Sequence, residues 1–246
     1  MTKNKRLTAF TLAEVLITLA IIGVVAALTL PTLIQDARDK ATVSKVKKMW
    51  TTLANAVKMA EVHNGDVADW GEYKMDQATG KMIAEKLKPY LKVDEMCGSE
   101  GCKHYNVTTP LFLNGDKDVN DVDFSKDNYY KMILTDGSVV IIRVYDTTCD
   151  KNNASCFTLS IDINGDNGPN IQGRDIFQLG AIQYKAATLK ILGGYGENPV
   201  TTPDWASCDP KRGQGWYCTA WVIYKENLDY LKCAEKLSWS GKSTCK

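Results

Sequence analysis

The sequence is poor in the residues that carry most metal and catalytic chemistry. Only two histidines occur, His63 and His104, and no two cysteines have the CxxC spacing. A zinc site would therefore have to consist of cysteines alone, at unusual spacings. Neither histidine lies beside a serine or cysteine nucleophile motif. We therefore expect both histidines to be exposed to solvent and not to be catalytic. These absences argue against a zinc protein and against a Ser- or Cys-based hydrolase.

The chain also lacks a strong net charge. It carries 30 Lys and Arg against 29 Asp and Glu, for a formal charge of +1. This balance gives no reason to expect nucleic acid or an acidic substrate as a partner. Hydrophobic residues make up 44% and charged residues 24%, as in ordinary globular proteins. A length of 246 residues without internal repeats allows one substantial domain with additional segments, or two small domains.

No catalytic motif is complete. The stretch from Gly241 to Thr244 matches the end of a phosphate-binding loop, but Lys236 stands where the first glycine belongs. The strand–loop–helix pattern that such a loop requires does not surround it. We therefore expect a protein that is not an enzyme.

An uncharged hydrophobic run covers residues 15–34. A helical run of about 20 residues spans a bilayer core of about 30 Å. A secretory signal would be cleaved after the run, where Ala26-Ala27 is available, but the helical pattern continues past this point. Glu14 directly precedes the run, and a carboxylate drawn into the membrane costs about 2.5–3.5 kcal/mol. Glu14 therefore either stays at the interface or has a partner.

The beginning of the chain resembles a known processing signal. The stretch KNKRLTA followed by FTLAEVLITLAIIGVVAALTLPTLI is similar to the prepilin cleavage and methylation motif of type IV pilins and type II secretion pseudopilins. In that family a short basic leader ends in a small residue, here Ala9 in place of the usual glycine. The mature chain begins with Phe, here Phe10. A glutamate four residues later and a proline 21 residues past the mature start match Glu14 and Pro31.

The resemblance implies roles for these positions. A membrane prepilin peptidase would cut between Ala9 and Phe10 and methylate the new amine. Because the cut precedes the hydrophobic run, the apolar helix would be kept. Glu14 would pair with the Phe10 amine of a neighbouring subunit, which offsets two charges otherwise isolated among packed helices.

The resemblance also implies partners and a location. The partners would be copies of the chain and other pilins in a helical filament, the peptidase, an inner-membrane assembly platform and membrane lipid. No nucleic acid is among them. The chain would cross the cytoplasmic membrane once with its head outside, and then join a periplasmic or extracellular filament.

All cysteines lie downstream of the hydrophobic run. An even number of cysteines in an exported region favours disulfides over metal binding. Pairing of sequence neighbours is one of many possible connectivities, and we expect every cysteine to be oxidised. The eight residues are Cys97, Cys102, Cys149, Cys156, Cys208, Cys218, Cys233 and Cys245, which would pair as 97–102, 149–156, 208–218 and 233–245.

A helical pattern continues beyond the hydrophobic run. Apolar residues recur at spacings of three and four at Val43, Val46, Trp50, Leu53, Val57 and Ala60. The pattern predicts one helix from Phe10 to about Asn64, which Pro31 should kink or locally unwind. The expected parts are a leader at 1–9, a transmembrane and assembly segment at 10–36, and a globular head at 37–246 that begins with the helix 37–64.

The sequence of the rest of the head predicts a β-sheet. Residues 128–146 alternate apolar and polar side chains around Asp136-Gly137, which is typical of a hairpin. A long helix followed by hairpin-linked strands indicates an α+β, pilin-like fold with an antiparallel sheet laid on the helix. We further expect a short helix at 80–91, irregular chain at 94–128, strands at 156–163, 176–184 and 219–225, and a long loop at 193–218.

One loop has the composition of a cation site. Calcium prefers oxygen ligands, and the loop starts like an EF-hand, but Gly168 and Gly173 occupy its seventh and twelfth positions. The loop is therefore either a calcium site or a turn rich in Asn, Asp and Gly. Calcium in some pseudopilin heads adds weight to the first interpretation. The candidate ligands are Asp162, Asn164, Asp166, Asn170 and Asp175.

We interpret the chain as a structural subunit of a type IV pilus, or fimbrium, or of a type II secretion-like pseudopilus. The alternative is a minor tip pilin that acts as a membrane-tethered adhesin or binding head. Its aromatic residues would then form a carbohydrate or surface-binding patch, although small disulfide-held domains also use such residues as core. These residues are Trp205, Trp216, Trp221 and Trp239.

Overall fold

The computed structural model describes residues 11–98, 101–117, 122–145, 149, 155–183, 186–190, 200 and 207–246. The chain divides into two units, Met1–Ala41 and Thr42–Lys246. The second unit contains the sheet and is called the head below. The helices are α1 (Leu12–Asn64), α2 (Gln77–Leu87), α3 (Cys218–Lys225) and α4 (Tyr230–Cys233), with 3-10 turns at Val67–Asp69, Lys88–Tyr90 and Ala234–Lys236.

The predicted long helix is confirmed as α1, which has 53 residues. It ends where Gly65 takes a positive φ of 82°, a conformation that glycine adopts without strain. We predicted a kink or local unwinding at Pro31; the helix is continuous through this residue, so it does not unwind there, and the kink stays a prediction. Within the head, α1 buries the predicted stripe, to which Met49 and Ala56 also belong, whereas Trp50 is half-buried.

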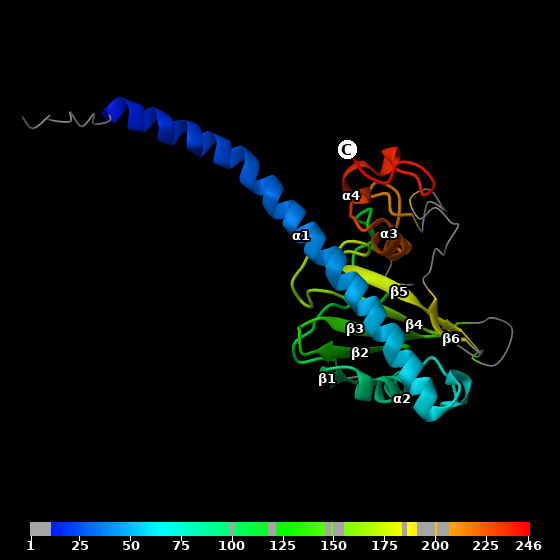
Figure 1. Ribbon diagram of the computed structural model, residues 1–246. Helices are drawn as coiled ribbons and strands as arrows, with labels where there is room; N and C mark the ends of the chain where they lie inside the picture. Colours follow the sequence, from blue (N-terminus) through cyan, green and yellow to red (C-terminus); the bar gives the residue numbers. More distant parts are fainter. Residues whose placement is uncertain are drawn as a thin grey trace, which may run out of the picture. The chain divides into compact units, whose positions relative to one another are not determined.

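The predicted antiparallel sheet is also confirmed, and it has six strands in sequence order (Figure 1). Neighbouring strands are therefore always consecutive along the chain, as in a meander. The strands are β1 (Val93–Cys97), β2 (Tyr129–Leu134), β3 (Val139–Val144), β4 (Ser155–Asp162), β5 (Ile176–Gln183) and β6 (Ala186–Lys190).

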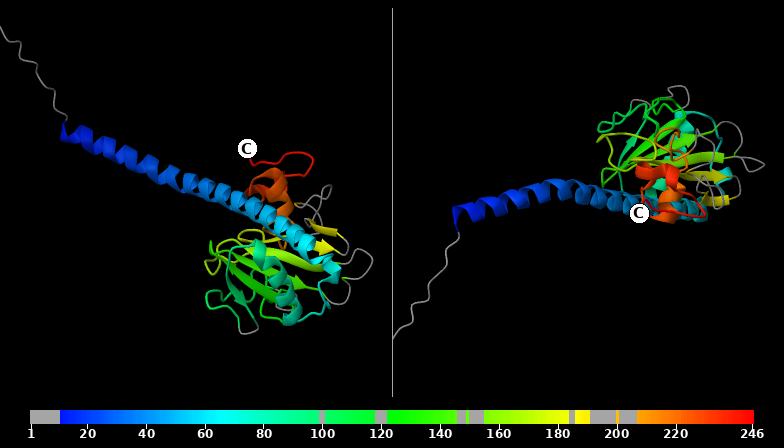
Figure 2. Two further views of the ribbon diagram at one scale, coloured as in Figure 1. Left: turned by 60° about the horizontal axis from the view of Figure 1, so that its bottom comes forward. Right: turned by 90° about the horizontal axis from the view of Figure 1, so that it is seen from above.

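The head part of α1 crosses one face of this sheet, with α2 beside it (Figure 2). Leu53 and Val57 of α1 join one apolar core with Met132, Ile142 and other residues that point to the same face. Loop residues, Tyr105, Phe112 and Phe124 among them, cover the opposite face. Because both faces are covered, β2 and β3 are buried along almost their whole length, and each has a single charged residue, Lys131 and Arg143.

Three parts of the head differ from expectation. Residues 219–225 are not a strand but lie in the helix α3. Trp, Val, Ile and Tyr favour strands locally, but Cys218, Trp221 and Val222 are spaced as one helical face and are fully buried. We also missed β1, whose two carboxylates conceal its alternation, and β6. The short helix is confirmed, and it begins at Gln77 because Asp76 caps it.

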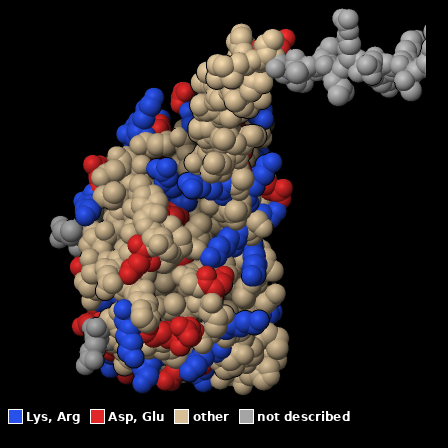
Figure 3. Space-filling view, turned by 90° about the vertical axis from the view of Figure 1, so that its left-hand side faces the viewer, with Lys and Arg blue, Asp and Glu red and all other residues tan. Residues whose placement is uncertain are grey.

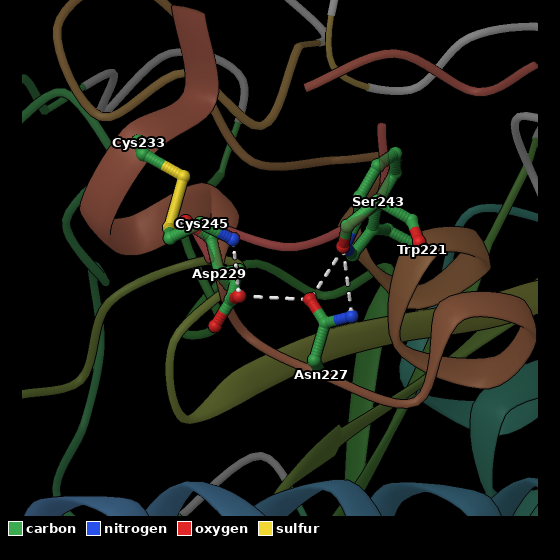
Figure 4. Close-up of a disulfide and its surroundings, with 6 residues drawn as sticks. All are labelled: Trp221, Asn227, Asp229, Cys233, Ser243 and Cys245. Atoms are coloured by element: carbon green, nitrogen blue, oxygen red, sulfur yellow. Dashed lines mark hydrogen bonds between the residues drawn. A yellow bond between two sulfur atoms is a disulfide. The ribbon is translucent and has the colours of Figure 1, made fainter. Parts of the chain in front are cut away.

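The four predicted disulfides are present, and all eight cysteines are paired. The last one, Cys233–Cys245, fastens the C-terminal segment next to a side-chain amide (Figure 4). Asn227 Oδ1 accepts hydrogen bonds from the Trp221 indole and from the Asp229 backbone, and its Nδ2 donates to Ser243 O. The C-terminal segment is therefore held by a covalent bond and by a satisfied polar network.

Candidate functional site

The first candidate site is the start of α1. Ala9 and Phe10, between which we predict cleavage, lie outside the described residues. Thr11 is the residue before the helix, and its N–H and its hydroxyl each donate to Glu14 Oε2 over 2.8 Å. The Glu14 N–H donates back to Thr11 Oγ1 over 3.2 Å. This reciprocal arrangement is a capping box, which satisfies backbone donors that a helix start leaves unpaired.

The capping box gives Glu14 a partner that we did not foresee. The signal was present in the sequence, because Thr-x-x-Glu before an apolar run is the pattern of a capping box. The bond to the Thr11 N–H directs the carboxylate toward the residue that follows Phe10. The carboxylate therefore lies beside the backbone N–H of Thr11, one residue after the predicted mature start.

The remainder of the first unit offers apolar side chains to its surroundings. Within the single chain, Leu12 is 78% exposed and Leu28 is 72% exposed, and the large apolar residues between them are also exposed. Among the described residues, α1 is the one helix that is long and apolar enough to cross a membrane. An uninterrupted apolar surface of this length needs lipid or other helices to cover it.

The head has a different surface. In Figure 3, basic and acidic side chains are interspersed over its visible face, and neither sign dominates a large area there. Such a face has no extended field of one sign, which phosphate backbones require for binding.

The second candidate site is the loop that follows β4. Asp162 is fully buried and Asp175 is 4% exposed. Asp162 accepts hydrogen bonds from the Asn164 N–H over 3.1 Å and from the Tyr105 hydroxyl over 3.1 Å. Asp175 accepts from the N–H groups of Asn170 and Ile171, at 2.8 and 2.6 Å. The Asn164 side-chain amide donates to Asp175 over 3.4 Å, so Asn164 bonds to both carboxylates, through its backbone to Asp162 and through its side chain to Asp175.

Two amide oxygens in this loop lack a hydrogen bond. The Oδ1 atoms of Asn164 and Asn170 are buried and have no donor in the structure. Asp166 does not join the group, because its carboxylate accepts two hydrogen bonds from Asn106 instead. The structure therefore brings four of the five predicted ligands together and turns Asp166 away. Among the described residues, no three His, Cys, Asp or Glu side chains form a group that could hold a metal ion.

Burial is costly for the two carboxylates. It raises the pKa of Asp162 to about 7, helped by the charge of Asp175 and opposed by the hydrogen bonds that the carboxylate accepts. Burial also raises the pKa of Asp175 against its hydrogen bonds from the backbone. Both charges thus lie in a place that disfavours them, and a cation would compensate them.

The three described tryptophans of the predicted surface patch do not form an exposed group. Trp216 and Trp221 are core residues, at 8% and 0% exposure. Trp239 is half-buried and packs against Trp221 and Tyr224, with ring centroids 6.1 and 5.7 Å away. Trp205 lies outside the described residues.

Comparison with known protein families shows two matches to the chain. The model described as "Family of unknown function (DUF6613)" matches residues 32–232. The chain belongs to this family. The model of the "Prokaryotic N-terminal methylation motif" matches residues 5–30, so this member of DUF6613 carries the prepilin-type motif of type IV pilins and pseudopilins. No curated protein and no solved structure matches the chain significantly.

Together these findings describe a pilin-like subunit of the DUF6613 family. The motif and the apolar half of α1 are those of a membrane-anchored pilin-like protein that is processed by a prepilin peptidase and assembles with other pilins. The α+β head with its long N-terminal helix is the architecture that such subunits have.

Proposed function

We propose that this chain is a structural subunit of a type IV pilus or of a type II secretion-like pseudopilus. It is cut between Ala9 and Phe10, and its apolar helix then moves from lipid into the core of the filament. The observation that carries this proposal is the position of Glu14, whose carboxylate points to the start of the helix. There it can meet the methylated amine of a neighbouring subunit.

The apolar surface of α1 supports the same proposal. Over the part of the chain that the structure describes, the large apolar residues from Leu12 to Ile34 are exposed. Lipid tails cover them as well as other helices do, so burial alone does not drive the helices together. A charge pair between Glu14 and an amine, by contrast, is worth most where lipid and helices exclude water. This pair would therefore set the register of neighbouring subunits.

The capping box allows a test that separates charge from helix capping. Gln at position 14 preserves the capping box but removes the charge, whereas Thr11→Ala removes the capping hydroxyl and keeps the charge. We expect Glu14→Gln to reduce filament yield at least tenfold and Thr11→Ala to reduce it much less. Both variants should reach the membrane in wild-type amounts. Normal filaments from Glu14→Gln would refute the role of the charge.

Mass spectrometry of the mature N-terminus tests the processing step. We expect an N-methylated chain that starts at Phe10. A chain that starts at Met1, or near Ala27 as after a secretory signal, would contradict the assignment.

We also propose that the loop after β4 binds calcium through Asp162, Asn164, Asn170 and Asp175. The unpaired oxygens of the two asparagines and the two buried carboxylates fit a hard cation, and backbone oxygens or water would complete its shell. The cation would neutralise the two charges and hold the loop in one conformation. Asp166 is not part of this proposal.

Thermal unfolding of the full chain in detergent micelles tests the calcium proposal. At a calcium concentration about 100 times the Kd, linkage adds about 2.7 kcal/mol, which raises the Tm by about 5–10 °C over the value in chelator. Asp175→Asn should abolish this shift, and the matched variant Asp166→Asn should retain it. Equal melting of the wild-type chain in both buffers would show that the loop is only a turn.

A further inference from the structure

A cavity on the face of the sheet opposite α1 is lined by a lysine whose side chain is mostly buried. The cavity has a volume of about 250 Å³. Lys131 of β2 lines it and is only 7% exposed. Among the described residues, Lys131 forms no hydrogen bond and no salt bridge. Its Nζ lies 6.0 Å from the centre of the Tyr105 ring, a cation–π contact that partly compensates its charge.

The position of Lys131 is fixed by the sheet and by a disulfide. Cys97 of β1 is its direct cross-strand partner, so both side chains point to the same face. The Cys97–Cys102 bond closes the short loop that leads to Tyr105. The wall of the cavity next to the ammonium is therefore covalently held, and a ligand would meet a preformed site.

A second unpaired group lies in the same cavity. Gln77 lines it, and its Nε2 donates to the Tyr129 backbone oxygen over 2.8 Å. This bond orients the amide and leaves Oε1 as a buried acceptor without a donor. The residues that line the cavity thus include one cation that lacks an anion and one glutamine whose buried amide oxygen lacks a donor.

The neighbouring acidic residue does not fill this role. Asp123 is close enough to favour the charged form of Lys131, but no ion pair joins them, and its carboxylate accepts from the N–H and the hydroxyl of Ser125. Burial lowers the pKa of Lys131 more than Asp123 raises it. An anion from outside would therefore relieve an uncompensated buried charge.

We propose that this cavity binds a small hydroxy acid, a class that includes the sugar acids. The carboxylate of the ligand would pair with Lys131, and a hydroxyl group would donate to Gln77 Oε1. An amino acid fits less well, because its ammonium group would be repelled by Lys131 in the same small space. Phe124 and Tyr105 also line the cavity and offer apolar surface to the carbon skeleton of the ligand. This binding would be independent of filament assembly, so its failure would leave the subunit role untouched.

Glucuronate is a suitable probe, and glucose is its uncharged counterpart. We expect saturation-transfer NMR with the full chain in neutral detergent to show glucuronate binding with a Kd of about 1 mM or tighter. Methyl glucuronide, which mimics the terminal sugar of a glycan, distinguishes two sources of the ligand. Equal binding of glucuronate and methyl glucuronide indicates that the ligand is the end of a glycan. Binding of glucuronate alone indicates that the ligand is a free solute. Either result supports the site.

Matched variants test the role of Lys131. Lys131→Met should weaken glucuronate binding at least tenfold, and Gln77→Met should weaken it less. Lys103→Met removes the same charge from an exposed position outside the cavity and should leave binding unchanged. Thermal unfolding would verify that all variants are folded. No glucuronate binding by the wild-type chain, equal binding of glucose, or unchanged binding by folded Lys131→Met would each overturn the proposal.

Discussion

The two faces of the sheet differ in what they bury. The face toward α1 and α2 is apolar, with Tyr130, Met132 and Leu134 of β2 in its core. On the opposite face, alternation along the same strand places Tyr129, Lys131 and Ile133. The buried polar residues of the described strands all point to this second face, and they are Lys131, Thr158, Asp162 and Gln178.

This difference suggests that one face of the sheet stabilises the head and that the other face binds ligands. A face that must hold a long helix gains most from apolar packing, because every buried polar group needs a partner. The opposite face is covered by loops that carry polar groups of their own. Tyr105 connects Lys131 and Asp162, the two buried charged residues of this face. The Tyr105 ring lies beneath Lys131, and the Tyr105 hydroxyl donates to Asp162. Hence we expect the apolar face to determine folding and the opposite face to determine what the head binds.

The largest effect should follow from damage to the apolar face. Leu53 of α1 is fully buried, and Leu53→Ala should destabilise the head by about 2–5 kcal/mol. The matched variant Leu28→Ala changes a residue that is 72% exposed in the same helix, and it should leave head stability within about 0.5 kcal/mol of wild type. Urea unfolding of the full chain in detergent, followed by tryptophan fluorescence, measures both. Similar losses in both variants would contradict the assignment of the core.

A smaller loss is expected where α2 approaches β2 on the same face. A Cβ atom at Gly80 would lie 2.6 Å from Tyr130 Cβ, so Gly80→Ala forces the helix and the strand apart. We expect a loss of about 1–3 kcal/mol, as for other overpacked cores. Gly98 is the control on the opposite face, because a Cβ atom there would meet nothing within 4 Å. If Gly98→Ala is as damaging as Gly80→Ala in the same unfolding assay, the two faces do not differ as described.

The sequence predicted the apolar face better than the opposite one. The stripe of α1 and the strands β2 to β5 follow from periodicity, because burial acts on each side chain locally. The pairing of cysteines was also predicted, since each disulfide closes a short loop. By contrast, the Lys131 cavity depends on residues from three separate segments, and nothing in the local pattern around Lys131 shows that its partner is missing. The sequence also did not predict that Asp166 points away from the loop site, because its hydrogen-bond partner Asn106 lies 60 positions earlier in the chain.

Propensity misled us where tertiary contacts outweigh it. Residues 219–225 favour a strand by composition, yet they lie in the helix α3, which packs against β5. Their burial against the core and the Cys208–Cys218 bond select a helix. The Thr11–Glu14 capping box is a different case, because its Thr-x-x-Glu pattern is local and is present in the sequence itself.

The smallest effect concerns the buried charge on the opposite face. Burial lowers the pKa of Lys131 in the folded protein below the value of about 10.4 in unfolded chains. Below the folded-state pKa, Lys131 is charged in both states and destabilises the fold. Above the unfolded-state pKa it is neutral in both states and this penalty vanishes. The stability of the wild-type head, relative to a variant without this charge, should therefore rise with pH between the two pKa values.

Lys131→Met should thus be more stable than wild type at neutral pH, by on the order of 1 kcal/mol, because replacement of a poorly compensated buried charge by an apolar group of similar size is often stabilising. The advantage should shrink as the pH approaches about 10.5. Lys103→Met, which removes an exposed charge, should show no such trend. Urea unfolding at several pH values from neutral to alkaline measures both differences. A constant difference across this range would mean that the Lys131 ammonium is already compensated in the folded head, and the cavity would then have no unmet demand for an anion.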